Sequence, residues 1–205
     1  DGTFLKNFNK NKINNIGIEP SKNVANIARK NGIKTINQFF TYKNASKLKK
    51  LKNNTDIICA ANAICHVPNL KDLIKGIDFL LGKEGIFIFE EPYLGSMFKK
   101  VSYDQIYDEH IFMFSVSAIK KTFKLFDFDL IDVLPQTTHG GSMRYVVARR
   151  NSYKIKNNVQ KYLKYEKNNN IDNIKGCLKF KKKCEASKKK LNHKIKKIKK
   201  TGKNI

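Results

Sequence analysis

The chain has 205 residues, and its 40% hydrophobic and 11% aromatic content predicts a folded core rather than a disordered polypeptide. It contains no apolar run of about 18 residues, so the sequence predicts neither a transmembrane helix nor a membrane partner. The formal charge of +25 suits nucleic-acid binding, but lysine greatly outnumbers arginine, the better bidentate ligand of phosphates; we therefore favour a solvated lysine surface over a nucleic-acid site.

The first part of the chain alternates between helical and strand patterns. The helical pattern is strongest at residues 70–81, where apolar residues recur at helical spacing, Asn69 can cap the start and Gly82 is expected to mark the end. Such alternation predicts right-handed strand–helix–strand units on a parallel sheet. In chain order we predict a helix at 3–8, a strand at 13–19, a helix between Ser21 and Gly32, a strand at 33–40, a short helix at 43–52, a strand at 55–62, the helix at 70–81 and a strand at 84–92.

The alternation stops after residue 92. A long connection rich in aromatic residues occupies residues 93–115 and is followed by a predicted helix at 117–126. Two further strands are predicted at 129–135 and 142–150, and we expect them to form an antiparallel pair. After residue 150 the pattern is helical and lysine-rich, with enough apolar residues for one contact face.

Five residues mark the ends of predicted strands or the start of a helix, where ligands bind in open α/β sheets. Gly2 precedes a helix and could let the backbone approach a ligand there, or could be a plain turn. Glu19 ends a strand, where an acid can bind ribose hydroxyls, although it could equally favour the dipole of the next helix. Ala60 and Asn62 would leave room and polar groups for a flat ligand, whereas Phe40 could flank an adenine or belong to the core.

Three further stretches carry polar groups that could bind or react. Residues 107–110, Tyr-Asp-Glu-His, could be a polar surface loop or a set of acid/base groups beside an apolar wall. His66 follows a strand and could be a hydrogen-bonded core residue or a site residue. In the stretch at residues 139–144, the paired glycines Gly140 and Gly141 could present backbone amides to a ligand, and Arg144 could bind a phosphate. Alternatively, the stretch could be a hairpin turn.

An ordered series of motifs resembles a known family. DGTFLKNF, GIEPSKNVA, NAICHVPNL, EEPYLGS, IYDEHIFMFS and HGGSMR resemble the S-adenosylmethionine-dependent sugar C-methyltransferases, which act on nucleotide-linked keto-deoxysugars. The resemblance implies an α/β fold with a Rossmann-like class I methyltransferase sheet, helices on both faces, and a lysine-rich helical segment after it. It also implies that residues 1–150 are a methyltransferase domain lacking its N-terminal part, including a zinc-binding domain, and that residues 151–205 lead into a truncated C-terminal domain.

The resemblance also implies roles for individual residues. Methylation of a carbon beside a ketone needs a base that removes a proton and a donor that stabilises the enolate. By resemblance, His110 is the base, Glu109 orients the sugar or the imidazole, and Tyr107 donates to the keto oxygen. His66 resembles a second active-site histidine. The implied cofactor is S-adenosylmethionine, bound by Gly2, Glu19, Phe40, Ala60 and Asn62, and the implied substrate is a nucleotide-sugar near His139, Gly140, Gly141, Ser142 and Arg144.

Other interpretations stay open at this stage. The chain could methylate oxygen or nitrogen of another small molecule, could bind RNA through its lysines, or could be a nicotinamide-dependent dehydrogenase on a similar sheet. The strand pair after Pro135 and the YDEH stretch argue against the dehydrogenase. Because no zinc-ligand spacing exists among Cys59, Cys65, Cys177 and Cys184, we expect no metal site. We also expect a reduced, cytoplasmic protein, for which a monomer is a plausible state.

Overall fold

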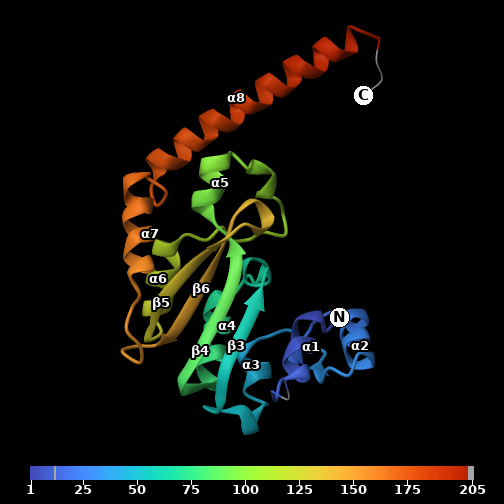
Figure 1. Ribbon diagram of the computed structural model, residues 1–205, viewed down its shortest axis with the longest axis vertical. Helices are drawn as coiled ribbons and strands as arrows, with labels where there is room; N and C mark the ends of the chain where they lie inside the picture. Colours follow the sequence, from blue (N-terminus) through green and yellow to red (C-terminus); the bar gives the residue numbers. More distant parts are fainter. Residues whose placement is uncertain (12, 203–205) are drawn as a thin grey trace. The chain divides into compact units, whose positions relative to one another are not determined.

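The computed structural model describes residues 1–11 and 13–202, which divide into two compact units (Figure 1). The first unit combines residues 1–56 with 69–83, and the second combines residues 57–68 with the chain from residue 84 onward. The helices after residue 150 belong to the second unit, and the expected domain division at that residue stays a prediction.

The first unit is mainly helical, with a small parallel sheet in which Gly17 lies opposite Thr35. Its two strands are only two residues long, although the sequence predicts longer ones. The side chain of Asn37 explains the early end, because its amide donates to the Glu19 and Pro20 carbonyls where the ladder would otherwise continue. The elements are α1 (Thr3–Lys10), β1 (Gly17–Ile18), α2 (Lys22–Lys30), β2 (Thr35–Ile36), α3 (Tyr42–Ala45), η1 (Lys49–Leu51) and α4 (Leu70–Leu80).

Helix α4 confirms the strongest helical prediction. Asn69 caps it by accepting a hydrogen bond from the Asp72 amide, and its apolar face is buried, with Leu73, Ile74 and Ile77 at most 3% exposed. The expected stop at Gly82 is wrong. The chain turns extended at the fully buried Leu81, so the helix ends without a left-handed glycine and Gly82 lies in the following strand.

The second unit contains a mixed four-stranded sheet in the order β3-β4-β6-β5. Strand β6 runs antiparallel to both of its neighbours, so the expected antiparallel pairing of the last two strands is confirmed. One face of the sheet buries stacked aromatic rings, with Phe89 against Phe87 and against Tyr145 at centroid distances of 4.9 Å. The strands are β3 (Thr55–Ala61), β4 (Leu81–Pro92), β5 (Phe128–Gln136) and β6 (Ser142–Arg149).

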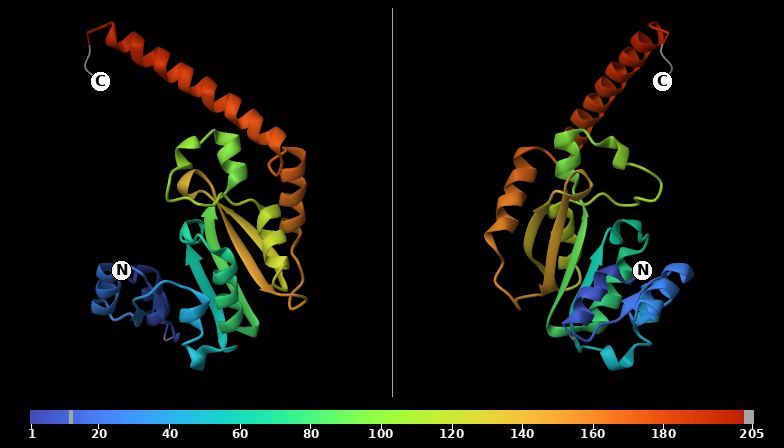
Figure 2. Two further views of the ribbon diagram at one scale, coloured as in Figure 1. Left: turned by 180° about the vertical axis from the view of Figure 1, so that it is seen from behind. Right: turned by 45° about the vertical axis from the view of Figure 1, so that its right-hand side comes forward.

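Helices complete the second unit. Helices α6 and α7 pack against β5 and against each other, and α8 continues from the end of α7 (Figure 2). The connection at residues 93–115 holds two helical segments that the sequence did not predict, α5 and η3. Within the described residues, no helix has the length and apolar character needed to cross a membrane. The helical elements are η2 (Ile64–His66), α5 (Leu94–Lys100), η3 (Tyr103–Gln105), α6 (Val116–Lys124), η4 (Thr138–Gly140), α7 (Asn157–Asn168) and α8 (Ile174–Lys199).

Candidate active site

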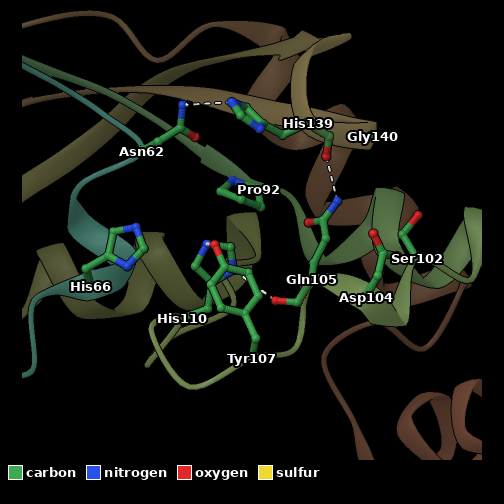
Figure 3. A pocket seen from close by; sticks show the side chains of 10 residues that line it. All are labelled: Asn62, His66, Pro92, Ser102, Asp104, Gln105, Tyr107, His110, His139 and Gly140. Atoms are coloured by element: carbon green, nitrogen blue, oxygen red, sulfur yellow. Dashed lines mark hydrogen bonds between the residues drawn. The ribbon is translucent and has the colours of Figure 1, made fainter.

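A pocket of about 310 Å³ lies in the second unit, beyond the ends of β3 and β4 (Figure 3). Three segments form it: the end of β3 with η2, the loop at residues 93–115, and the turn before β6. Its position at strand ends is the usual place for a ligand in an α/β fold. The lining residues are Asn62, His66, Pro92, Ser102, Asp104, Gln105, Tyr107, His110, His139 and Gly140.

Tyr107 and His110 form a hydrogen-bonded pair in this pocket. The Tyr107 hydroxyl lies 2.8 Å from His110 Nε2, and the other ring nitrogen, Nδ1, lies 2.9 Å from the Gln105 carbonyl oxygen. A carbonyl oxygen can only accept a hydrogen bond, so the proton of the neutral ring must reside on Nδ1. The lone pair of His110 is therefore on Nε2, where the Tyr107 hydroxyl donates to it and where a base would act.

His66 lies beside this pair and fastens the short turn η2 to the loop. Its ring centroid is 5.1 Å from that of His110, and its Nδ1 donates to the Glu109 carbonyl at 2.7 Å. The Cys65 carbonyl also accepts hydrogen bonds from the amides of Ile111 and Phe112. The contact of Glu109 with His66 is through its backbone, and the exposed Glu109 side chain is not part of the pocket lining.

The turn η2 is held from below by Glu91, a fully buried acid near the end of β4. One Glu91 oxygen accepts hydrogen bonds from the Ala63 and Ile64 amides at 2.9 and 2.7 Å. Burial, and then the hydrogen bond and charge of Glu91, raise the pKa of the Cys65 thiol. Cys65, His66 and His110 offer ligand atoms within 4.8 Å of one another.

The opposite side of the pocket comes from strained backbone. Asn62 and His139 both have left-handed φ angles, of 48° and 47°, and their side chains are hydrogen-bonded at 3.2 Å between Asn62 Nδ2 and His139 Nε2. The Gln105 amide donates to the His139 carbonyl and so joins this turn to the loop (Figure 3). Such backbone conformations concentrate at functional sites, because the surrounding structure must hold them.

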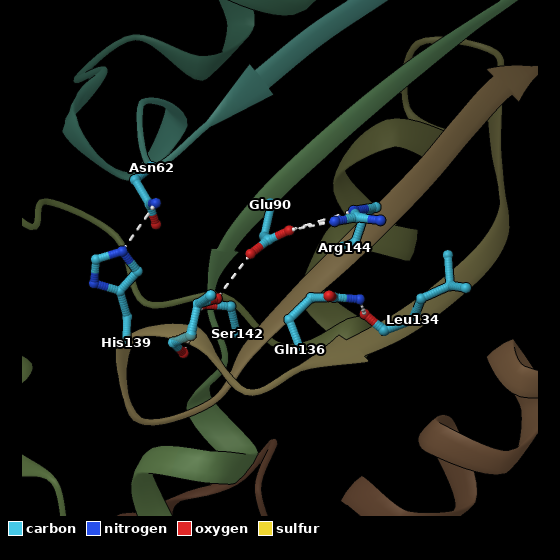
Figure 4. Close-up of polar contacts among 8 residues, drawn as sticks. Asn62, Glu90, Leu134, Gln136, His139, Ser142 and Arg144 are labelled. Carbon is cyan, nitrogen blue, oxygen red and sulfur yellow. Dashed lines mark hydrogen bonds and ion pairs between the residues drawn. The ribbon is translucent and has the colours of Figure 1, made fainter. Parts of the chain in front are cut away.

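The rest of the HGGSMR motif supports the turn rather than lining the pocket. Arg144 pairs with Glu90, the residue opposite it on β4, at 3.0 Å between Nη2 and Oε2 (Figure 4). Ser142 is buried and donates to the Thr138 carbonyl. Gly141 has a φ of 122°, and a Cβ there would lie 2.6 Å from the Ser96 hydroxyl oxygen. Substrate contacts by these three residues stay predictions.

The predicted cofactor residues are divided between the two units. Gly2, Glu19 and Phe40 belong to the first unit, and Ala60 and Asn62 belong to the second, at the end of β3. Gly2 precedes α1 with a φ of 83°, and the Glu19 carboxylate accepts a hydrogen bond from the Ser21 amide at 2.8 Å. The Phe40 ring lies against Gly76 of α4, where a Cβ would be 2.9 Å from it, so Phe40 has at least a packing role.

The sequence interpretation missed several residues of the site. Gln105 received no role, although its backbone orients His110 and its side chain holds the His139 turn. Pro92, Ser102 and Asp104 also line the pocket, within or just before the long connection. The only available signal was their position after a predicted strand end, which marks a ligand-binding edge but not the contributing side chains.

An α/β fold with a polar pocket beyond its strand ends is typical of proteins that bind small molecules. Comparison with known proteins identifies the family. Residues 1–133 match the family described as a methyltransferase domain, and residues 137–205 match a C-methyltransferase C-terminal domain. The chain therefore belongs to the methyltransferase-domain family. Membership implies S-adenosylmethionine as the methyl donor.

Relatives and solved structures agree with this assignment. The chain is 27% identical over 142 residues to the C-methyltransferase NovU of Streptomyces niveus, covering 69% of this chain but 34% of NovU, so it spans about a third of that relative. A protein of Pyrococcus horikoshii superposes with a TM-score of 0.56, 16% identity, and coverage of 73% of this chain and 77% of that one. A SAM-dependent methyltransferase of Anabaena variabilis superposes with a TM-score of 0.55 and 18% identity, and the match covers 73% of this chain and 74% of that one. These two structures establish the fold.

Proposed function

We propose that this protein transfers a methyl group from S-adenosylmethionine to a carbon atom of a nucleotide-linked keto-deoxysugar, through an enolate. The observation that carries the proposal is the Tyr107–His110 pair in the pocket, with His110 oriented by the Gln105 carbonyl. The relative NovU, a C-methyltransferase, and the C-methyltransferase C-terminal match at residues 137–205 support carbon as the acceptor atom.

His110 performs the first chemical step. Its Nε2 lone pair takes the proton from the carbon beside the ketone, so the C–H bond breaks, an N–H bond forms, and the electron pair moves onto the keto oxygen as an enolate. The imidazolium that results still donates through Nδ1 to Gln105, so the ring needs no rotation. Neutral histidine suits this step because its ordinary pKa is close to neutral pH.

Tyr107 stabilises the charge that develops. In the free protein its hydroxyl donates to His110 Nε2. Nε2 has a single lone pair, so this bond must break before Nε2 can take the substrate proton. The freed hydroxyl then donates to the keto oxygen, where the enolate charge develops. The Tyr107 hydroxyl therefore contacts His110 in the free protein and stabilises the enolate during the reaction. We assign His66, whose ring lies beside that of His110, to the same substrate. The Glu109 side chain does not line the pocket, so its predicted role toward the sugar or the imidazole stays a prediction.

The first unit carries features that fit the nucleoside of S-adenosylmethionine. Gly2 has the left-handed backbone that lets α1 begin beside a ligand, and Glu19 follows β1 as a ribose-binding acid would. Phe40 of the first unit, and Ala60 and Asn62 of the second unit, stay predicted cofactor residues. S-adenosylmethionine supplies an electrophilic methyl group on a positively charged sulfur, and the enolate carbon is the nucleophile that accepts it.

The pocket supports a sugar as the acceptor. A volume of about 310 Å³ suits a small ligand, and the lining offers hydroxyl, carboxylate and amide groups from Ser102, Asp104 and Gln105. A ring with several hydroxyl groups can use such a lining, whereas an aromatic acceptor would leave it unpaired. The ordered motif series that resembles sugar C-methyltransferases adds the nucleotide-linked keto-deoxysugar.

The location of the transferred methyl group tests this function. The protein would be incubated with S-adenosylmethionine carrying a ¹³C-labelled methyl group and a panel of nucleotide-linked keto-deoxysugars, and the product examined by NMR. We expect a new carbon–carbon bond at the carbon beside the ketone, which re-forms as the enolate carbon takes the methyl group. A label on oxygen or nitrogen would identify a different methyltransferase, and no transfer to any keto-sugar would refute the proposed acceptor.

A further inference from the structure

Glu166 of α7 is a fully buried acid that contacts the two ends of the loop at residues 93–115. Its Oε1 accepts a hydrogen bond from the Tyr93 hydroxyl at 3.0 Å and one from the Val116 amide at 2.6 Å, and its Oε2 accepts from the Ser117 amide at 2.8 Å. Tyr93 precedes the loop's first helix, whereas Val116 and Ser117 begin α6. One carboxylate thus joins the segment before the loop to the segment after it.

The electrostatics of this contact explain why a buried charge is tolerated there. The two amides are unpaired donors at the N-terminus of α6, where the helix dipole favours a negative group. The Tyr93 hydroxyl adds a third donor, and burial together with the Glu166 charge raises the pKa of Tyr93, so it remains a donor. A carboxylate is the side-chain group that can accept all three bonds at once.

Two further contacts join the same helical tail to the same loop. The Tyr162 ring of α7 meets the Tyr93 ring edge-on at 6.0 Å, and the Phe180 ring of α8 stacks on Phe98 of α5 at 4.7 Å. The loop closes on itself at its base, where the Leu94 amide donates to the Phe114 carbonyl at 2.9 Å. Helices α7 and α8 therefore hold the base of the loop and its first helix.

The loop fixed in this way carries half of the pocket: Ser102, Asp104, Gln105, Tyr107 and His110. We infer that Glu166 is a positioning residue for the base, which holds the ends of the loop so that Tyr107 and His110 face the acceptor. The inference rests on the proposed function. It also means that a residue far from the pocket in sequence, within the C-methyltransferase C-terminal match, controls the geometry of residues in the methyltransferase-domain match.

The test compares three variants with a matched control. Glu166→Ala removes the acceptor oxygens of all three hydrogen bonds. Glu166→Gln keeps one oxygen for Tyr93 and Val116 but places an amide donor against the Ser117 amide. Tyr93→Phe removes one bond and keeps the ring contact with Tyr162. Glu185→Gln makes the same chemical change at an exposed position of α8 and serves as the control.

Amide hydrogen exchange at residues 93–115 is the first measurement, on the ligand-free protein. We expect exchange to be faster by about tenfold or more in Glu166→Ala, less in Glu166→Gln, least in Tyr93→Phe, and unchanged in Glu185→Gln. If Glu166→Ala does not fold, Glu166→Gln and Tyr93→Phe still test whether Glu166 holds the loop. Exchange in folded Glu166→Gln and Tyr93→Phe that equals the wild-type rate would overturn the inference.

Steady-state kinetics is the second measurement. We expect Glu166→Gln to lower kcat by up to about 100-fold, because a displacement of about 1 Å at the reacting atoms is that costly, while affinity for S-adenosylmethionine is retained. Lower thermal stability with normal kcat would show a purely structural role and overturn the positioning role. If the Glu166 variants show faster exchange in the loop but the wild-type protein methylates no keto-sugar, Glu166 does hold the loop and the proposed function is refuted instead.

Discussion

The His66 side and the His110 side of the pocket are held by different means. His66 belongs to η2, a turn directly after β3, and Glu91 of the neighbouring strand binds the amides just before it. His110 belongs to the loop at residues 93–115, and Glu166 of a distant helix binds that loop only at its ends. The sheet therefore preorganises η2. The loop is tied to η2 next to His110, through Cys65 and His66, and to α7 at its two ends. The proposed base therefore lies on the loop whose two ends contact Glu166.

Removing the base should have the largest effect on this comparison. We predict that His110→Ala lowers kcat by about 10²- to 10⁴-fold, the usual contribution of a general base, while binding of S-adenosylmethionine is unchanged. Methyl transfer and calorimetric cofactor binding would be measured together. His193→Ala, at an exposed position of α8, is the matched control and should behave as wild type. Full activity of His110→Ala would remove the chemical importance of the loop side.

Removing the hydroxyl of Tyr107 should have the next largest effect. Tyr107→Phe loses the donor to the enolate oxygen, and we expect kcat to fall by about 10²- to 10³-fold, as for removal of one oxyanion donor. The hydroxyl also contacts His110 in the free protein, so the histidine ring signals in an NMR spectrum should shift in the same variant. A variant with normal kcat would confine Tyr107 to a packing role.

Breaking the sheet-held side should appear mainly in stability. Glu91→Ala removes the acceptor of the part-buried Ala63 amide and of the buried Ile64 amide, and we expect the free energy of unfolding to fall by about 3 kcal/mol. Urea unfolding would measure this loss. Hydrogen exchange should stay slow in the distant part of the loop near Ser102, in contrast to the Glu166 variants. Loosening of the whole loop in Glu91→Ala would show that the two sides are not held independently.

The smallest predicted effect concerns Tyr145 of β6, a core residue near both buried acids, Glu91 and Glu166. Tyr145 is fully buried, its hydroxyl has no hydrogen-bond partner among the described residues, and burial followed by the charges of Glu166 and Glu91 raises its pKa. The unfolded chain loses this proton near pH 10 while the folded chain keeps it, so stability falls as pH rises above that value, by about 1.4 kcal/mol per pH unit for this group. Tyr145→Phe should unfold normally at pH 7 and lose less stability between pH 10 and 11. An unchanged alkaline slope would contradict this assignment.

Much of the fold was predictable from local pattern. Helix α4 has a strong apolar stripe and an Asn cap, and the structure confirms both. Strand positions from residue 55 onward were also recovered, because their apolar runs are long. The two strands of the first unit lie within their predicted ranges but are shorter, since Asn37 replaces the sheet ladder with side-chain bonds. The helical segments α5 and η3 were not predicted, because at 7 and 3 residues they are too short to show a helical period.

The site was predictable where its residues are adjacent in sequence. Tyr107, His110 and His66 were chosen from a motif series, and the structure places all three around one pocket. Glu166 could not be found in this way, because it lies among lysines in a helical tail and its partners are far earlier in the chain. The Arg144–Glu90 pair depends on strand register, which single-sequence pattern does not supply.

The most direct test of the proposed chemistry is deuterium exchange at the acceptor carbon. A nucleotide-linked keto-deoxysugar would be incubated with the protein in D₂O without S-adenosylmethionine, and deuterium beside the ketone followed by NMR. The proposed role of His110 predicts that deuterium enters at that carbon with the wild-type protein and not with His110→Ala. Incorporation at equal rates in both proteins, or none with a wild-type protein that methylates the same carbon, would contradict it.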